Sequence, residues 1–312
     1  MRHLLITGAS GFLGRHVTRA ALDGTEARIR LVRHAGSLAG AAPQRAEIVH
    51  ADLTDAASVH GLCRDVDAVV HCASLIGGDN DSLRAVNQNG TEALVADALR
   101  HGVRRIVYVS TAAVYGRGPF RDADVHGLAI GPQSTTSRTR AAAERLVLAA
   151  GGTVLRPHLV YGAGDRWVVP GLATLLRRLQ ASVRCHSLHS AVDVGALARA
   201  ALAAALSDRD LSGAHHVNHP SPVRGSDLVE TAMAHLQHEL TDSVLPDEAR
   251  SRLAGDREAL HHLDMLTEDH WFRSETVWRL LDCDPGPEPA TGLARHASWY
   301  RRRIGSAAVD GR

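Results

Sequence analysis

The sequence predicts an α/β fold with a doubly wound parallel sheet and a smaller C-terminal lobe. Three observations support this prediction. Short apolar runs alternate with helical patterns in the first half of the chain, a glycine-rich turn follows the first run, and the pattern changes after Pro157. Apolar strands separated by helices are typical of a parallel sheet with helices on both faces.

The expected strands and helices follow one another in order along the chain. Strands are predicted at Leu4–Thr7, Ile29–Val32, Ile48–His50, Ala68–Cys72, Ile106–Ser110, Val154–Arg156 and Ala214–Asn218. Helical spacing of apolar residues predicts helices at Gly11–Leu22, Ser82–Arg100, Thr135–Ala149 and Val192–Ala205. The segment Gly162–His189 is expected to be irregular, and residues 240–312 are expected to be helical.

These elements predict two parts. Residues 1–161, with 190–220 returning to them, are expected to form a nucleotide-binding domain of the Rossmann type. Residues 162–189 and 221–312 are expected to form a substrate lobe over the carboxyl ends of the strands, where ligands of such sheets bind.

Composition narrows the class of protein. The 312 residues are 45% hydrophobic and 22% charged with a net charge of +1, which favours a globular protein without a nucleic-acid or anionic-membrane surface. Four widely spaced cysteines predict reduced thiols, and the absence of long apolar runs and of a signal peptide predicts a cytoplasmic location. The histidines are scattered without a metal-binding motif, so no metal site is expected. The oligomeric state stays open.

Gly8, Gly11 and Gly14 lie three residues apart, directly after the first predicted strand. Glycines at such a turn let the backbone approach a pyrophosphate, and the helix that follows offers free N–H groups. We therefore predict a dinucleotide site here, with Ser10, Phe12 and Leu13 in the same turn. The alternative is a purely structural turn.

The end of the second predicted strand indicates which dinucleotide binds. An NAD site places an acidic residue there, but Val32 is followed by Arg33 and His34. A guanidinium suits a 2′-phosphate, so the cofactor is predicted to be NADP(H), with Arg33 as the main contact and His34 assisting. The alternative is that Arg33 is a solvated loop residue.

With further motifs, the chain resembles the extended short-chain dehydrogenase/reductase family from Met1 to about Tyr300. The matching stretches include Thr7–Gly14, Val109–Gly116 and Arg156–Gly162. The resemblance implies cofactor contacts at Asp52, Leu53, Cys72, Ala73, Ser74, Asn87, Pro157 and His158, and it puts Thr111 in the place of a catalytic hydroxyl.

The chain departs from that family at one place. Where the family has Tyr-x-x-x-Lys, this sequence has Thr136 and Arg140, and it contains no lysine at all. A phenol titrates near about 10 and can be tuned by a neighbouring cation, whereas an aliphatic hydroxyl and a guanidinium are far poorer proton donors. The catalytic roles of Thr136 and Arg140 therefore stay open, with Arg140 able to hold a ribose hydroxyl.

Protonation then needs another source. Candidate side chains are Tyr115, Tyr161, His158, His186 and His189. A second hypothesis is a phenolic hydroxyl beside the reacting ketone of an aromatic substrate, which would stabilise the developing oxyanion and supply the proton. The substrate pocket is predicted to include Leu75, Ala112, Ala113, Tyr161 and Trp167.

The leading functional prediction is an NADPH-dependent ketoreductase. The resemblance is strongest to atypical angucyclinone ketoreductases, which implies reduction of a carbonyl of a polycyclic aromatic polyketide in antibiotic biosynthesis, with an aromatic ketone as the small-molecule partner. Two alternatives stay open. One is a non-catalytic NADP(H)-binding sensor or partner protein, and the other is a nucleotide-sugar epimerase or dehydratase.

Overall fold

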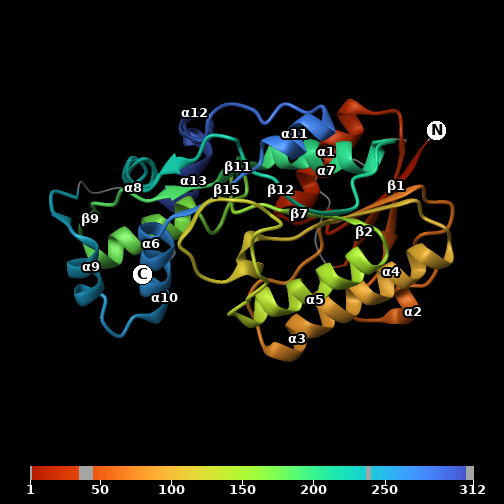
Figure 1. Ribbon diagram of the computed structural model, residues 1–312, viewed down its shortest axis with the longest axis horizontal. Coiled ribbons are helices and arrows are strands. Elements are labelled where there is room, and N and C mark those ends of the chain that lie inside the picture. Colours follow the sequence, from red (N-terminus) through yellow and green to blue (C-terminus); the bar gives the residue numbers. More distant parts are fainter. Residues whose placement is uncertain (1, 35–44, 237–239, 307–312) are drawn as a thin grey trace.

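A seven-stranded parallel sheet forms the centre of the molecule (Figure 1). The computed structural model describes residues 2–34, 45–236 and 240–306. The strand order is β12-β7-β5-β4-β1-β2-β3. The strands are β1 (His3–Thr7), β2 (Arg28–Arg33), β3 (Ala46–His50), β4 (Ala68–His71), β5 (Arg105–Val109), β7 (Thr153–Arg156) and β12 (Gly213–His216). The predicted doubly wound α/β fold is therefore confirmed, because all pairs in this sheet are parallel.

Helices cover both faces of this sheet (Figure 1). One face carries α1 (Phe12–Gly24), α7 (Val194–Leu206) and α11 (Glu275–Leu281), whose apolar residues share one core with the strands. The other face carries α4 (Gly90–Arg100) and α5 (Thr135–Ala149), together with the short α2 (Ala56–Val59) and α3 (Asn80–Arg84). Because α11 packs on α7, a segment after residue 220 returns to the central sheet.

Two local predictions need correction. The single helix predicted over Ser82–Arg100 is interrupted by a π-helical turn, Ala85–Asn89, between α3 and α4. The helix predicted from Val192 begins at Val194, because residues Ala191–Asp193 form β11 and pair with β8 (Leu159–Tyr161). Periodicity does not reveal a single wider turn or a three-residue strand.

A second lobe follows the carboxyl ends of the central strands (Figure 1). It contains a four-stranded sheet in the order β13-β10-β15-β6 and a small parallel pair, β14 with β9. Its strands are β6 (Phe120–Ala123), β9 (Ser182–Val183), β10 (Leu188–His189), β13 (Val223–Arg224), β14 (Ser243–Val244) and β15 (His270–Phe272). Its helices are α6 (Val169–Leu179), α8 (Gly225–Met233), α9 (Pro246–Arg252), α10 (Arg257–Thr267), α12 (Pro289–Arg295) and α13 (Ala297–Ser306).

The lobe corrects two further predictions. The segment Gly162–His189 is not irregular, because α6 occupies its centre and buries Leu172, Leu175 and Leu176 in the lobe core. Within 240–312 the chain is mostly helical, but β14 and β15 interrupt the helices. No helix in the described ranges combines the length and apolarity that a bilayer span requires.

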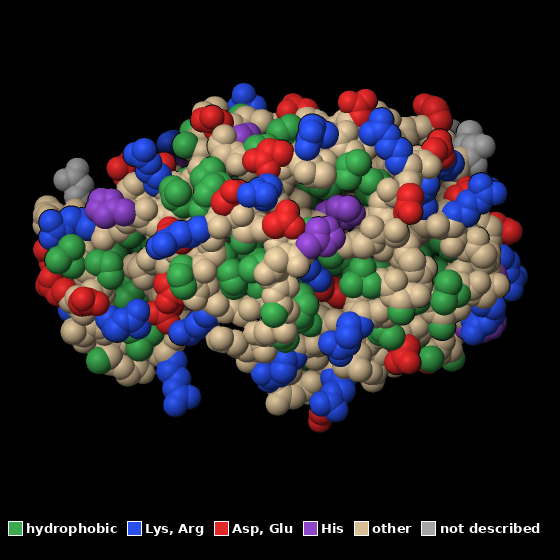
Figure 2. Space-filling view, in the orientation of Figure 1, with side chains coloured by type: hydrophobic (Ala, Val, Ile, Leu, Met, Phe, Trp, Pro, Cys, Tyr) green, Lys and Arg blue, Asp and Glu red, His purple; other side chains and the backbone are tan. Residues whose placement is uncertain are grey.

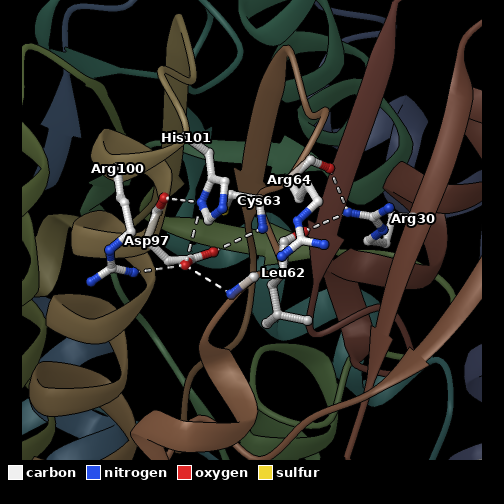
Figure 3. Close-up of polar contacts among 8 residues, drawn as sticks. Arg30, Leu62, Cys63, Arg64, Asp97, Arg100 and His101 are labelled. Atoms are coloured by element: carbon white, nitrogen blue, oxygen red, sulfur yellow. Dashed lines mark hydrogen bonds and ion pairs between the residues drawn. The ribbon is translucent and has the colours of Figure 1, made fainter.

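A buried carboxylate holds the loop between α2 and β4 in place (Figure 3). Asp97 of α4 accepts hydrogen bonds from the backbone N–H groups of Gly61 and Cys63, each at 2.9 Å, and from Arg100 at 3.0 Å. Arg30 of β2 donates to the carbonyl oxygens of the same loop at Leu62 and Arg64. The loop between α2 and β4 is therefore fixed by charge-assisted hydrogen bonds as well as by apolar packing.

Candidate active site

The glycine turn after β1 has the geometry of an anion site. Gly8 has a φ of +66°, and a Cβ on Gly14 would lie 2.0 Å from the Gly8 carbonyl oxygen. Gly11 donates to the same oxygen at 2.8 Å and is the N-cap of α1, which has no side-chain cap and no acidic residue in its first turn. The exposed Ser10 and Gly11 precede the half-buried Phe12 and Leu13. The turn thus leaves the first N–H groups of α1 available to a phosphate.

A buried chain of hydrogen bonds runs from this turn across the sheet. Thr91 donates to the Asn87 carbonyl oxygen at 2.6 Å, so its Oγ1 accepts from His71 Nε2 at 2.9 Å. His71 Nδ1 then accepts from the Thr7 hydroxyl at 2.6 Å. Burial, helped by the charge of Arg140, lowers the pKa of His71 to about 3, so the imidazole is neutral.

Asn87 lies in the π-helical turn and joins three elements. Its Oδ1 accepts from the Leu75 N–H at 2.7 Å, and its Nδ2 donates to the Leu75 carbonyl oxygen at 3.0 Å. The same amide donates to Thr139 Oγ1 of α5 at 3.1 Å, and Ser74 Oγ donates to Asn87 Oδ1 at 3.2 Å. A π-turn often marks a functional site, and here it aims the amide at the loop that follows β4.

The loop after β4 brings several predicted residues against the glycine turn. A Cβ on Gly8 would lie 2.7 Å from the backbone nitrogen of Ala73, so only glycine permits this approach. Ala73 also donates to Thr7 Oγ1 at 3.3 Å. Cys72 precedes it, and burial raises the pKa of its thiol to about 12, which keeps the thiol protonated.

Thr111 begins a short 3₁₀ helix, Ala112–Tyr115, directly after β5. Its hydroxyl accepts from the Ala113 N–H at 3.2 Å, while the Ala112 N–H donates to the Pro157 carbonyl oxygen at 2.8 Å. Ala112 is buried and Ala113 is exposed. The structure therefore places Thr111, Ala112 and Pro157 together at the carboxyl ends of β5 and β7.

Thr136 and Arg140 lie one turn apart on α5, whose capping box is formed by Ser134 and Ser137. Arg140 Nη2 donates to the Val109 carbonyl oxygen at 2.6 Å, and its guanidinium lies 5.9 Å from the centre of the Tyr108 ring. Arg140 is thus held against the end of β5, where a guanidinium binds but does not release a proton.

Two of the candidate proton donors, Tyr115 and Tyr161, are buried. Tyr115 Oη contacts His216 Nε2 at 2.7 Å and accepts from Arg156 at 2.8 Å. Arg156 in turn forms a buried ion pair with Glu144 at 2.6 Å. Tyr161, also predicted as a substrate contact, is 1% exposed in the lobe core and abuts Gly292 of α12. Burial raises the pKa of both tyrosines, so neither phenol is activated as an acid.

Arg33 is the last residue of β2 and His34 follows it, so both lie at the carboxyl end of the strand, where the adenosine end of the cofactor is expected. Arg33 lies against the ring of His50 on β3, its register partner, and among the described residues its buried Nε has no hydrogen-bond partner. His34 is exposed and lies 3.4 Å from the carboxylate of Asp52. The Asp52 carboxylate accepts a hydrogen bond from the Thr54 N–H. Leu53 packs against Gly90, where a Cβ would lie 2.8 Å from the Leu53 side chain.

The lobe crosses the start of α1. His16 contacts the Ala163 carbonyl oxygen at 2.9 Å, and a Cβ on Gly164 would collide with the guanidinium of Arg15 and with Phe12. Trp167, predicted as a substrate contact, is 54% exposed and lines a hollow of about 230 Å³ on the lobe with Arg166, Arg177 and His262. Figure 2 shows a notch between the second lobe and the side of the molecule that carries α3 and α5, and it shows acidic and basic side chains interspersed over this face.

The ring of His158, another candidate proton donor, has its Nε2 buried. Its backbone N–H donates to Asn218 Oδ1 at 2.8 Å, and its ring lies 5.3 Å from the ring of His270 and 6.2 Å from that of His189. Burial lowers the pKa of His158 well below the ordinary value and that of His189 to about 4. Sequence reasoning missed this grouping, because the three residues are far apart in the chain.

Both the sequence and the fold are similar to those of known enzymes. Residues 5–246 match the 3-beta hydroxysteroid dehydrogenase/isomerase family. The chain belongs to this family. It is one of the extended short-chain dehydrogenase/reductases, as the motifs predicted. Related proteins are named as reductases and dehydrogenases, and this family member is an oxidoreductase that acts on a C=O/CH–OH group.

Two relatives and one solved structure illustrate the similarity. A 2-alkyl-3-oxoalkanoate reductase of Stenotrophomonas maltophilia is 28% identical over 94% of this chain and 97% of its own length. A ketoreductase of Stigmatella aurantiaca, named for a farnesylated dihydroquinoline oxide, is 31% identical over 55% of this chain and 54% of its own. The dTDP-glucose 4,6-dehydratase DesIV of Streptomyces venezuelae, solved with NAD, has a TM-score of 0.77 at 23% identity and covers 97% of this chain and 98% of its own.

Proposed function

We propose that this enzyme is an NADPH-dependent ketoreductase that reduces a carbonyl of a polycyclic aromatic ketone of the angucyclinone type in antibiotic biosynthesis. One observation carries the proposal. The family's tyrosine and lysine positions hold Thr136 and Arg140, and Arg140 is tied to the Val109 carbonyl oxygen at 2.6 Å. A substrate that protonates itself fits a site from which the usual acid is missing.

The residues fit a nicotinamide dinucleotide. A side chain at Gly8 or Gly14 would collide with backbone atoms, and the first turn of α1 carries no acidic residue. Arg33, whose Nε lies buried and without a partner among the described residues, supports NADP(H) over NAD because a 2′-phosphate would satisfy it. When bound, the cofactor supplies a hydride to the carbonyl carbon.

The chain's own residues position the reactants. In this proposal Thr111, at the start of the 3₁₀ helix, donates a hydrogen bond to the substrate oxygen, and the small, exposed Ala113 lies beside the flat ring. The hydride adds to the carbonyl carbon, and the proton moves to the oxygen from a phenolic hydroxyl of the substrate. Water then reprotonates the phenolate, so that ketone, hydride and one solvent proton give the alcohol.

Two likenesses support the substrate class. The chain resembles the angucyclinone ketoreductase of simocyclinone biosynthesis, which also lacks the tyrosine–lysine pair. The Stigmatella relative is named as a ketoreductase of a 3-oxo-3,4-dihydroquinoline-1-oxide, whose ketone ring is fused to a benzene ring.

A matched pair of ketones tests the proposal. One polycyclic ketone carries a hydroxyl hydrogen-bonded to its carbonyl, and the other carries hydrogen or a methoxy group there. With NADPH deuterated at C4, we expect deuterium at one face of the carbinol carbon and a rate at least about 100-fold lower for the ketone without the hydroxyl. Equal rates would contradict substrate-derived protonation. Tight NADPH binding without turnover of either ketone would contradict the proposed substrate class.

A further inference from the structure

Three histidines from distant parts of the chain meet where the central sheet joins the second lobe. His158 follows β7, His189 ends β10 and His270 begins β15. His189 and His270 are register partners of the parallel pair β10 and β15, so their side chains leave the same face of the lobe sheet. One ring nitrogen from each of the three residues lies within 4.8 Å of the other two.

The hydrogen bonds around two of the rings resemble the outer shell of a metal site. His270 Nδ1 donates to the Glu268 carbonyl oxygen at 3.0 Å, so its Nε2 carries the lone pair. This Nε2 accepts a long hydrogen bond of 3.3 Å from the Gly118 backbone N–H, which a metal ion would replace. His189 Nε2 donates to the Leu266 carbonyl oxygen at 3.0 Å, which leaves a lone pair on its Nδ1. Metal-binding histidines characteristically donate their other ring N–H to a carbonyl or carboxylate, because this bond fixes the tautomer and the ring orientation.

Two of the ring nitrogens have no partner. Within the described ranges, His189 Nδ1 and His158 Nε2 are buried and make no hydrogen bond. His189 is 0% exposed, so water does not reach its nitrogen from outside. Unsatisfied buried polar atoms are costly, and a bound ion would satisfy both of them at once.

We propose that His158, His189 and His270 bind one divalent transition-metal ion of the kind that prefers imidazole, such as zinc. Neutral imidazole suits Zn²⁺, Ni²⁺ and Cu²⁺ better than Mg²⁺ or Ca²⁺. Because the three nitrogens lie within 4.8 Å of one another, some point is no more than about 2.8 Å from all of them, and zinc needs about 2.0–2.1 Å. The rings therefore have to close by less than about 1 Å.

The ion joins two parts of the molecule. His158 directly follows Pro157. The Pro157 carbonyl oxygen accepts a hydrogen bond from the Ala112 N–H in the 3₁₀ helix that Thr111 begins. The other two ligands belong to the lobe sheet. His158 alone of the three is half-buried, so a fourth ligand enters from its side. Metal binding thus fixes the lobe against the carboxyl end of β7, and it removes His158 and His189 from the candidate proton donors.

The experiment measures metal binding in the full chain, without an affinity tag and after treatment with a chelator. Competition between the protein and a chromophoric chelator for Zn²⁺ is expected to reveal one site per chain. Cobalt in the same site is expected to give visible bands of low-symmetry nitrogen coordination. Saturating zinc is expected to raise the melting temperature by about 5 °C at 100 times the dissociation constant.

Phenylalanine keeps the ring volume while removing the ligand. In His189→Phe, the Leu266 carbonyl oxygen keeps its hydrogen bond from Ser187 Oγ at 2.5 Å. His189→Phe and His158→Phe are each expected to lower zinc affinity at least about 100-fold. The control is His186→Ala, at an exposed residue between β9 and β10, and it is expected to leave zinc affinity unchanged. Circular dichroism without metal verifies that each variant is folded.

One readout needs no variant. In wild-type protein with ¹⁵N-labelled histidine, zinc is expected to move the nitrogen resonances of three imidazoles together, at one equivalent. If the strongest zinc site keeps its affinity in both phenylalanine variants, or if no resonance shifts at one equivalent, the proposal is wrong. These outcomes are independent of ketone reduction.

Discussion

Arg140 donates a hydrogen bond from Nη2 to the Val109 carbonyl oxygen at 2.6 Å, and this contact ties α5 to the end of β5. The same guanidinium lies over the ring of Tyr108. A cation in this place therefore stabilises the junction of helix and strand, apart from any contact with a ribose.

Replacing Arg140 with methionine is expected to lower the free energy of unfolding by about 2 kcal/mol, because a charge-assisted hydrogen bond is lost. Urea unfolding measures this change. Arg145→Met, on the exposed face of the same helix, is the control and is expected to change stability by less than about 0.5 kcal/mol. Unchanged stability with a turnover loss above about 100-fold would instead make Arg140 a catalytic residue.

Removing the hydroxyl at the family's tyrosine position is expected to have little effect. Thr136→Ala should lower kcat by less than about tenfold, because an aliphatic hydroxyl is too weak an acid to carry the protonation. Steady-state kinetics with a hydroxylated polycyclic ketone measures it, with Thr135→Ala as the neighbouring control. A loss of about 100-fold or more for Thr136→Ala alone would assign the proton relay to this hydroxyl.

Cofactor preference depends on the end of β2. Arg33→Ala is expected to raise the KM for NADPH at least about tenfold and to leave the KM for NADH nearly unchanged, since only NADPH carries the 2′-phosphate. Arg28→Ala, an exposed arginine at the opposite end of the same strand, should affect neither. Equal effects of Arg33→Ala on both cofactors would contradict the assignment of NADP(H).

Stability is expected to fall in mild acid because of His71. The unfolded chain protonates this imidazole near pH 6.5, but burial lowers its pKa to about 3 in the folded protein. Between these values unfolding takes up a proton, so at pH 5 this residue alone lowers the free energy of unfolding by about 2 kcal/mol relative to pH 8.

The variant His71→Asn tests that origin. It is less stable at pH 8, because contacts with Thr7 and Thr91 are lost. Between pH 5 and 6, however, the variant should take up about one proton fewer on unfolding than the wild type does. The slope of its free energy of unfolding against pH should be smaller by that amount. An unchanged slope would place the proton uptake on other buried histidines, such as His216.

The carboxylate of Asp97 is expected to contribute more to the free energy of unfolding than most single side chains do. Burial alone would raise its pKa, but hydrogen bonds from Gly61 and Cys63 outweigh that effect and lower it. Asp97→Asn puts an amide N–H₂ opposite backbone donors, so unfolding free energy should fall by about 2–4 kcal/mol. Denaturant titration measures the change, and the exposed Asp81→Asn should alter stability little. A fall below about 0.5 kcal/mol would contradict the role given to this carboxylate.

The central sheet could be predicted from the sequence because its signals are local. Most of its strands are short apolar runs next to a helix, and α5 begins and ends at the predicted residues, Thr135 and Ala149. The glycine turn was also predictable, since the backbone atoms that crowd Gly14 belong to Gly8 and Ala9 of the same turn.

The second lobe was harder to predict for a physical reason. Strands of two or three residues, such as β10 and β15, have no measurable periodicity, and their pairing joins residues about 80 positions apart. The histidine group depends on that pairing, so spacing along the chain gave no sign of it. The burial of Tyr161 was missed likewise, because Gly292 covers it from a distant helix.

The packing of α11 has a consequence for how the protein is made. Trp278 fills the face of the sheet beside α7, and its indole N–H donates to the Asn218 carbonyl oxygen at 2.6 Å. During synthesis, that face therefore stays incomplete until residues near 281 have left the ribosome. The core of the nucleotide-binding half is therefore completed late, although six of its seven strands are finished by residue 156.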